Sequence, residues 1–182
     1  MIKSIFNEGQ PQSITEVLQN KDERVKLQQE ILQKFPETTL LDVKLNIPGP
    51  IKNNRYLEKI FAAGIFDLET VFQNSNLPLI LYEHWEKVTG PENFYLVNCN
   101  YRVVKEKAVE FEEHQKLNRL FDADVLIDKQ KQAISRKELG LPVRRCFLCS
   151  RPAKECARSR RHSVTDLQDY ITNLYRQEIS SD

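Results

Sequence analysis

The sequence is poor in glycine and contains no long uninterrupted apolar run. Only five glycines occur among 182 residues, which argues against long flexible linkers. No apolar segment approaches the roughly 20 residues of a membrane-spanning helix, and the N-terminal MIKSIFNEGQ lacks the apolar stretch of a secretory signal peptide. We therefore expect a cytoplasmic protein with no membrane partner, whose four cysteines are reduced thiols or metal ligands.

The rest of the composition is that of an ordinary globular protein. Hydrophobic residues make up 40% of the chain and charged residues 29%, which is enough apolar material to build a core. A chain of this length fits one domain. We predict a single domain over residues 1–182, in which residues 142–182 form an appended element: an Arg/Cys-rich loop followed by a C-terminal helix.

Hydrophobic periodicity predicts an α+β fold. Apolar residues at helical spacing indicate helices over 13–35, with a break near 20–22, over 55–72, with a break at Gly64, and from Ser163 onward. Alternating or continuous apolar residues predict strands, which we expect to form a mixed sheet flanked by helices. The strand segments are 38–47, 77–88, 93–99, 108–114 and 122–128.

Asp122 and Asp124 stand two positions apart in a predicted strand. Alternate side chains of a strand point to opposite faces, so we expect both carboxylates on one face and Phe121, Ala123 and Val125 on the other. Two neighbouring carboxylates repel unless a cation joins them, and Mg²⁺ accepts hard oxygen ligands and recruits substrate phosphates. The alternative is an exposed strand face with two solvated acids, which the short Asp-x-Asp pattern does not exclude.

Three further titratable residues precede this pair. Glu110 and Glu112 alternate in a predicted strand, so they either supply a third carboxylate from a neighbouring strand or form a solvated edge. An imidazole group in general changes its charge near neutral pH, so His114 is a candidate base for a substrate hydroxyl.

Three of the four cysteines fall in the stretch RRCFLCSRPAKECARSRRHS, residues 144–163. Cys146 and Cys149 have C-x2-C spacing, and Cys156 and His162 follow at wider intervals. These residue types bind Zn²⁺ in structural sites. Because the second half of the set is irregularly spaced, thiols that pack a turn and a reactive thiol are the alternatives.

Positive charge is concentrated in the same stretch. Residues 142–162 contain seven basic residues and one acidic residue, a local net charge of +6 on a chain whose net charge is +1. Arg158, Arg160, Arg161 and His162 directly precede the predicted C-terminal helix. A helix N-terminus favours anions and arginine forks bind phosphate, so we predict an anion-binding site. A solvated basic turn is the alternative. So compact a patch suits a compact anion better than a nucleic acid.

Four segments, NIPGPIKNN, NRLFDADVLI, LGLPVRRCFLC and CARSRRHS, resemble the apo-citrate lyase phosphoribosyl-dephospho-CoA transferases, also called citrate lyase holo-acyl-carrier-protein synthases. The segments occur in the family's order, and the resemblance runs from about Ser13 to the C-terminal helix. The Asp-x-Asp-Val of FDADVLI is also similar to the paired-aspartate motif of the nucleotidyltransferase fold. One departure is Asn118, where the family commonly has glycine.

The resemblance implies a reaction, its substrate and its partner. The family takes 2′-(5″-triphosphoribosyl)-3′-dephospho-coenzyme A, transfers the phosphoribosyl-dephospho-CoA unit to a serine of the acyl carrier (γ) subunit of citrate lyase, and releases pyrophosphate. Carried over by position, Asp122 and Asp124 become a catalytic pair that binds Mg²⁺. Arg119 and the arginines of 158–161 become ligands of the triphosphate, although the same basic patch could instead dock an acidic carrier protein.

A rival interpretation comes from another class of protein. A zinc-stabilised basic module could bind nucleic acid or an acidic protein without catalysis, using Cys146, Cys149, Cys156 and His162 as zinc ligands. It predicts stoichiometric zinc and indifference to Asp122→Asn, whereas the transferase interpretation predicts that this change abolishes transfer and leaves the fold intact.

Overall fold

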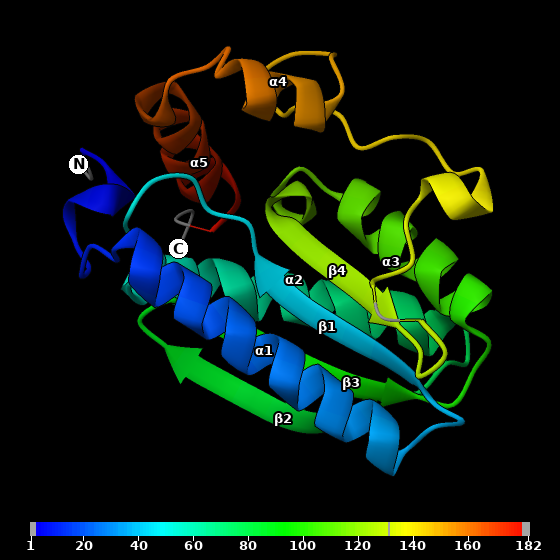
Figure 1. Ribbon diagram of the computed structural model, residues 1–182. Helices are drawn as coiled ribbons and strands as arrows, with labels where there is room; N and C mark the ends of the chain where they lie inside the picture. Colours follow the sequence, from blue (N-terminus) through cyan, green and yellow to red (C-terminus); the bar gives the residue numbers. More distant parts are fainter. Residues whose placement is uncertain (1–2, 131, 180–182) are drawn as a thin grey trace.

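The computed structural model describes residues 3–130 and 132–179 (Figure 1). Its centre is a four-stranded sheet with the order β2-β3-β1-β4. All three strand pairings are antiparallel, so the sheet is not mixed, while the predicted α+β class is confirmed. The strands are β1 (Thr39–Leu45), β2 (Ile80–Lys87), β3 (Gly90–Val97) and β4 (Phe121–Leu126).

Helices cover both faces of the sheet. One face carries α1 (Ile14–Lys34), and the other carries α2 (Arg55–Asn74) and α3 (Tyr101–His114) (Figure 1). The short α4 (Ala153–Ser159) and α5 (Val164–Glu178) lie beyond the end of the sheet where β1 ends and β4 begins (Figure 1). Short 3-10 turns are η1 (Ile5–Asn7), η2 (Leu117–Leu120) and η3 (Lys137–Leu139). No helix in the described part of the chain is long and apolar enough to cross a membrane.

The sheet separates two apolar layers. The larger layer lies on the side of α2 and α3 and also receives Ile171, Leu174 and Tyr175 of α5. The smaller layer lies under α1 and contains Ile31, Leu32, Leu40, Phe94, Leu96 and Leu126. This smaller layer covers only one end of its face. At the other end, the strand positions on the same face are charged, and these positions form the candidate site.

The predicted helix starts at Ser13 and Ser163 are confirmed, and both predicted helix breaks are wrong. Ser13 caps α1 and Ser163 caps α5, each with the acidic residue three positions on. Helices α1 and α2 run without interruption. Gly64 of α2 lies against Phe121, where an added Cβ would come within 2.1 Å of the ring. Glycine is therefore used here for a close helix–strand approach, not for a break.

Segment 108–114 is helical, so the strand prediction there is wrong. It forms the second half of α3, in which Val104, Ala108 and Phe111 are fully buried. Their spacing is that of one helix face, whereas seven residues of mixed alternation cannot distinguish a strand from part of a helix. The predicted strand over 38–47 and the C-terminal helix are confirmed as β1 and α5.

Candidate active site

Asp122 and Asp124 lie on the face of β4 that is turned toward α1. Phe121, Ala123 and Val125 between and beside them are fully buried on the opposite face. The side chains of Asp122 and Asp124 are 40% and 32% exposed. The predicted same-face arrangement of the two carboxylates is thus confirmed.

Lys44 of β1 joins the two carboxylates to a third. The antiparallel register places Lys44 opposite Asp122, and Asp42 opposite Asp124. Nζ of Lys44 lies 2.8 Å from Oδ2 of Asp124, 3.9 Å from Oδ2 of Asp122 and 4.0 Å from Oδ2 of Asp42. Carboxylates from two neighbouring strands therefore converge on one cationic group.

Burial and charge act in opposite directions on these groups. Burial would lower the pKa of Lys44, but the three aspartates raise it above its ordinary value, so the ammonium stays charged. Burial would raise the pKa of Asp124, but the charge and hydrogen bond of Lys44 lower it. For Asp42 burial prevails over the charge of Lys44 and raises the pKa well above its ordinary value. The negative charge of Asp42 is therefore less well compensated than that of Asp124.

Helix α1 and strand β3 contribute a second ion pair beside Asp42. Arg24 donates from Nε and Nη2 to the two carboxylate oxygens of Glu92, and Gln28 donates to Oδ2 of Asp42 at 2.6 Å. Oδ1 of Asp42 is buried and accepts no hydrogen bond from the residues that the structure describes. An unpaired buried oxygen destabilises the fold, and a metal ligand bond would satisfy it.

Sequence reasoning missed Arg24, Asp42, Lys44 and Glu92. These four residues come from three elements that only the strand register and the placement of α1 bring together. A signal was nevertheless present, because Asp42 and Lys44 interrupt the apolar pattern of a strand whose other positions are almost all apolar.

Arg144 lies at the outer edge of β4, next to Asp122. Its Nη2 donates to the backbone carbonyls of Arg119 and Phe121, both at 2.6 Å. Its Nη1 lies 3.4 Å from Oδ1 of Asp122. Two backbone contacts therefore fix one guanidinium beside one carboxylate. Arg144 was counted in the basic patch but was not singled out from the sequence.

Arg119 makes the reciprocal contact. Its Nη2 donates to the carbonyl oxygens of Arg145, at 3.0 Å, and Cys146, at 3.3 Å. The contacts of Arg119 in the structure thus attach the loop after residue 143 to the start of β4. Its predicted role as a triphosphate ligand stays a prediction.

A cavity of about 710 Å³ opens beside Asp122. Its walls come from the loop after β1, the start of β4, the Arg/Cys-rich stretch and the start of α5, including Asn46, Pro48, Asp122, Arg144, Phe147 and His162. This volume lies in the range of ligand-binding cavities, roughly 300–1,000 Å³. Asp122 is the member of the carboxylate cluster that reaches the cavity wall.

The four basic residues predicted as an anion site are divided by the structure. Arg160 and His162 line the cavity, whereas Arg158 and Arg161 are exposed and lie outside its wall. The N-terminus of α5 already has a carboxylate partner, because Asp166 accepts a hydrogen bond from the Ser163 N–H. Anion binding by these residues stays a prediction.

Glu110 and Glu112 lie on α3, which covers the opposite face of the sheet from Asp124. Glu112 accepts a hydrogen bond from the Ala123 N–H at 2.8 Å and pairs with Arg136. β4 is an edge strand of the sheet, and Glu112 accepts a hydrogen bond from one of its backbone N–H groups, which limits pairing of that edge with another chain. The third carboxylate near the aspartate pair is Asp42, on a neighbouring strand.

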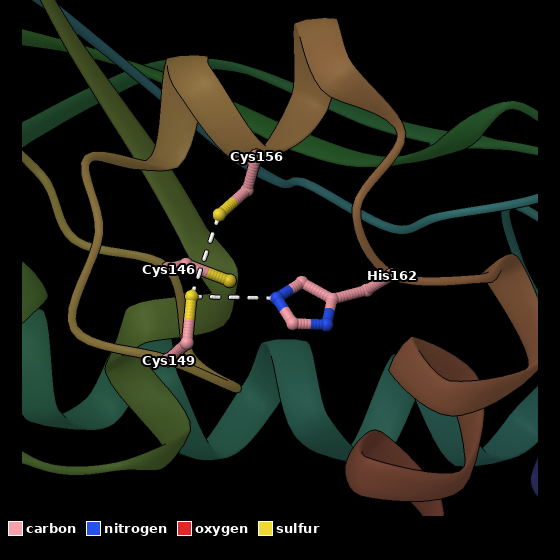
Figure 2. Close-up of side chains that lie close together, drawn as sticks. All are labelled: Cys146, Cys149, Cys156 and His162. Carbon is pink, nitrogen blue, oxygen red and sulfur yellow. Dashed lines mark hydrogen bonds between the residues drawn. The ribbon is translucent and has the colours of Figure 1, made fainter.

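Cys146, Cys149, Cys156 and His162 point toward a common centre (Figure 2). Their ligand atoms all lie within 4.8 Å of one another. Sγ of Cys149 is 3.4 Å from Sγ of Cys156 and 3.4 Å from Nε2 of His162. The hydrogen bond with His162 lowers the pKa of Cys149 to about 6, whereas burial and the neighbouring thiols raise that of Cys156 to about 11. The predicted set of four is thus assembled in space.

Convergent carboxylates, a fixed guanidinium and a cavity of ligand size are the features expected of an enzyme active site. The family model described as apo-citrate lyase phosphoribosyl-dephospho-CoA transferase matches residues 12–178, so the chain belongs to this family. Membership confirms the resemblance seen in the sequence and the prediction that the protein is a transferase.

Individual relatives agree with the family match. The chain is 33% identical over 184 residues to the probable apo-citrate lyase phosphoribosyl-dephospho-CoA transferase of Streptococcus pyogenes serotype M18, covering 100% of this chain and 95% of that protein. It is 34% identical over 155 residues to the corresponding protein of Citrobacter koseri, covering 85% and 84%. It is 35% identical over 170 residues to "Protein CitXG" of Leuconostoc mesenteroides subsp. cremoris, covering 93% of this chain but only 36% of that protein.

Proposed function

We propose that this chain transfers the phosphoribosyl-dephospho-CoA unit of triphosphoribosyl-dephospho-CoA to a serine of the acyl carrier subunit of citrate lyase, with release of pyrophosphate. Family membership supports the reaction. The structural observation that carries it is the position of Asp122, which belongs both to the carboxylate cluster around Lys44 and to the cavity wall beside Arg144. Transfer from a triphosphate depends on positioning and charge neutralisation, which these groups can provide.

Asp122 and Asp124, with Asp42 as a third carboxylate, are the residues that would hold Mg²⁺. One observation supports the fit: Oδ1 of Asp42 is buried without a hydrogen bond from any described residue. In this structure the three side chains converge on Nζ of Lys44, which would compete with the metal for their oxygens. When bound, Mg²⁺ would neutralise charge on the triphosphate and on the leaving pyrophosphate. Lys44 would share these carboxylates with the metal.

The basic residues divide into two proposed roles. Arg144, whose guanidinium is fixed by backbone carbonyls, and Arg160 in the same cavity wall are placed to bind phosphate oxygens. A donor held in position before the reaction loses little conformational freedom when it binds charge. The exposed Arg158 and Arg161 lie outside the wall, and we assign them to docking of an acidic carrier surface.

The reaction also needs an acceptor for one proton. Oγ of the carrier serine forms a bond to the phosphorus attached to the ribose, the bond from that phosphorus to pyrophosphate breaks, and the hydroxyl proton is released. Asp122 is the carboxylate of the cluster that lines the cavity wall, and we propose that the oxygen it would not give to the metal accepts the proton. His114, the other candidate, is exposed at the last residue of α3, on the helix that covers the opposite face of the sheet.

One assay tests the reaction directly. The protein is mixed with triphosphoribosyl-dephospho-CoA, Mg²⁺ and the apo carrier subunit, and the intact mass of the carrier is measured. We expect the carrier to gain the mass of one phosphoribosyl-dephospho-CoA unit, and a carrier whose acceptor serine is changed to alanine to gain none. An unmodified carrier, with both substrates shown to be intact, would refute the transferase assignment.

Charge reversal separates the two proposed roles of the arginines. Arg158→Glu should raise KM for the carrier and leave KM for the nucleotide substrate unchanged. Arg160→Glu should raise KM for the nucleotide substrate instead.

The rival non-catalytic module is disfavoured because the chain belongs to a transferase family. The cytoplasmic location and the absence of a nucleic-acid partner stay predictions.

A further inference from the structure

We propose that Cys146, Cys149, Cys156 and His162 bind one Zn²⁺ in a closed structural site. A tetrahedral site with Zn–S bonds of about 2.3 Å places its sulfur atoms about 3.8 Å apart. The four ligand atoms of this chain already lie within 4.8 Å of one another, and two of their separations are 3.4 Å. Small side-chain rotations therefore suffice to reach the metal geometry.

The backbone supplies the ligands in the manner of a compact metal-binding turn. The segment after Cys146 folds back on itself, with the Cys146 N–H donating to the carbonyl of Arg151 at 2.9 Å and a bridge between Arg145 and Pro152. Cys149 lies in the turn that these contacts enclose, and Cys156 lies on α4 (Figure 2). The first three ligands are thus brought together by local contacts.

The fourth ligand is brought back by an unusual residue. Arg160 ends α4 in the left-handed conformation, with φ 45° and ψ 42°. A residue other than glycine adopts this backbone conformation at a cost of the order of 1 kcal/mol. The reversal turns the chain so that His162, two residues later, faces the thiols (Figure 2). The free energy of a metal bond to His162 would offset the cost of the left-handed backbone conformation at Arg160.

The composition of the set points to a structural role. Four protein ligands leave no open coordination position, which is the mark of a structural zinc site. Cys146 and Cys156 are buried, as expected of ligands that organise a small core. A Cys149–Cys156 disulfide is the competing chemistry for the closest pair of thiols, but it would leave Cys146 and His162 without a function.

The metal site would position the loop that carries Arg144. Arg144 is two residues before Cys146, and its carbonyl accepts a hydrogen bond from the Ala153 N–H at 2.8 Å. Cys146, Cys156 and His162 also line the cavity that Asp122 reaches. Zinc would therefore hold one wall of the cavity at a fixed distance from the carboxylates. This consequence rests on the proposed function, whereas metal binding itself does not.

Metal content tests the binding. Protein purified with a reductant and without chelator is analysed by inductively coupled plasma mass spectrometry, and we expect about one zinc per chain. Cys149→Ser and His162→Asn should each lose zinc, whereas Cys99→Ser, which changes the one cysteine outside the set, should retain it. Loss of zinc from Cys99→Ser to the same extent as from Cys149→Ser would overturn the assignment.

The wild-type protein gives a second test that does not depend on the folding of any variant. Replacement of the metal by Co²⁺ should give the visible bands of a tetrahedral ion and the ultraviolet charge-transfer bands of thiolate ligands. No zinc on purification together with no Co²⁺ spectrum would overturn the proposal, as would a Cys149–Cys156 disulfide in the freshly purified protein. Because neither measurement involves transfer to the carrier, failure here is distinguishable from failure of the proposed function.

Discussion

Arg119 and Arg144 each hold the backbone of the other's segment. Nη2 of Arg144 donates to the carbonyl oxygen of Arg119 at 2.6 Å, while Nη2 of Arg119 donates to the carbonyls of the two residues that follow Arg144. These contacts join the loop before the cysteine cluster to the start of β4. Since Asp122 is the second residue of that strand, movement of the loop would change the surroundings of Asp122.

Arg144→Lys should reduce the rate of transfer. Lysine keeps the charge but lacks the planar fork that contacts two carbonyls and faces Asp122 at once. We expect kcat to fall by about 10²–10³-fold, the usual effect of removing one fixed donor from a charged transition state. Steady-state kinetics with each substrate varied in turn provides the measurement.

The matched control for Arg144→Lys is Arg151→Lys. Arg151 lies in the same basic stretch but is exposed and outside the cavity wall, so its kinetics should stay at the wild-type level. If Arg144→Lys raised only KM for the carrier, Arg144 would be a docking residue and its proposed role at the phosphates would be wrong.

Asp42→Asn should separate activity from stability. Burial raises the pKa of Asp42 in the folded protein, so the folded state holds the proton more tightly than the unfolded state. The stability that this provides is fully present below the unfolded pKa and is lost as pH rises through the folded pKa.

Asparagine keeps an oxygen for the Gln28 hydrogen bond but carries no charge. At neutral pH we therefore expect Tm to be equal or higher, and transfer to fall at least about tenfold through loss of a proposed metal ligand.

Thermal unfolding followed between pH 3 and pH 8 checks this prediction, with Asp22→Asn as the control. Asp22 is exposed on α1, so its replacement should leave both Tm and transfer unchanged. An Asp42→Asn protein with full activity would show that Asp42 is not part of the catalytic site, whatever its stability.

Lys44→Met should make the stability of the protein depend on divalent metal. Removing the ammonium leaves three carboxylates facing one another. Because Asp122 and Asp124 are partly exposed, we expect a loss of stability smaller than the about 3–5 kcal/mol of a fully buried pair. The effect has a definite pH dependence. Lys44 lowers the pKa of Asp124, so this pair stabilises the protein above the ordinary carboxyl pKa, and the contribution is lost as pH falls through the lowered value.

Mg²⁺ provides the decisive comparison for Lys44→Met. If the carboxylates bind the metal, it should raise Tm more in Lys44→Met than in the wild-type protein, because the ammonium no longer competes for the same oxygens. Lys44→Arg, which keeps a cation, should resemble the wild-type protein. Equal Mg²⁺ shifts in all three proteins would count against a metal site at these aspartates.

Local patterns in the sequence were sufficient for most of the fold. The capping residues Ser13 and Ser163 marked the beginnings of two helices, and the alternation around Val43 marked the central strand. The failures occurred where a local signal had two explanations. Gly64 indicated a break when judged by helix propensity, but the actual reason for glycine is contact with Phe121, some 57 positions later in the chain.

The candidate site was only half visible in the sequence for a related reason. Asp122 and Asp124 are close in sequence, so strand geometry alone placed them together. Asp42 and Lys44 are joined to them by the pairing of β1 with β4, and no local pattern specifies which strands pair. The cysteine set was visible because its members span only 17 residues, and the turn at Arg160 that completes it became apparent only in the structure.

Gly64→Ala should destabilise the protein although alanine is the better helix former. An alanine Cβ at this position would lie 2.1 Å from Cζ of Phe121, much closer than atoms can pack. Helix propensity favours alanine over glycine by about 1 kcal/mol, but overpacking of a core costs about 1–3 kcal/mol. We expect a net loss of up to about 2 kcal/mol in the free energy of unfolding, because the overpacking cost exceeds the gain in helix propensity. Urea denaturation provides the measurement.

The double variant Gly64→Ala with Phe121→Leu tests the cause, because removing the ring should relieve the clash and give a non-additive gain. Strictly additive losses would show that the contact with Phe121 is not the reason for glycine at this position.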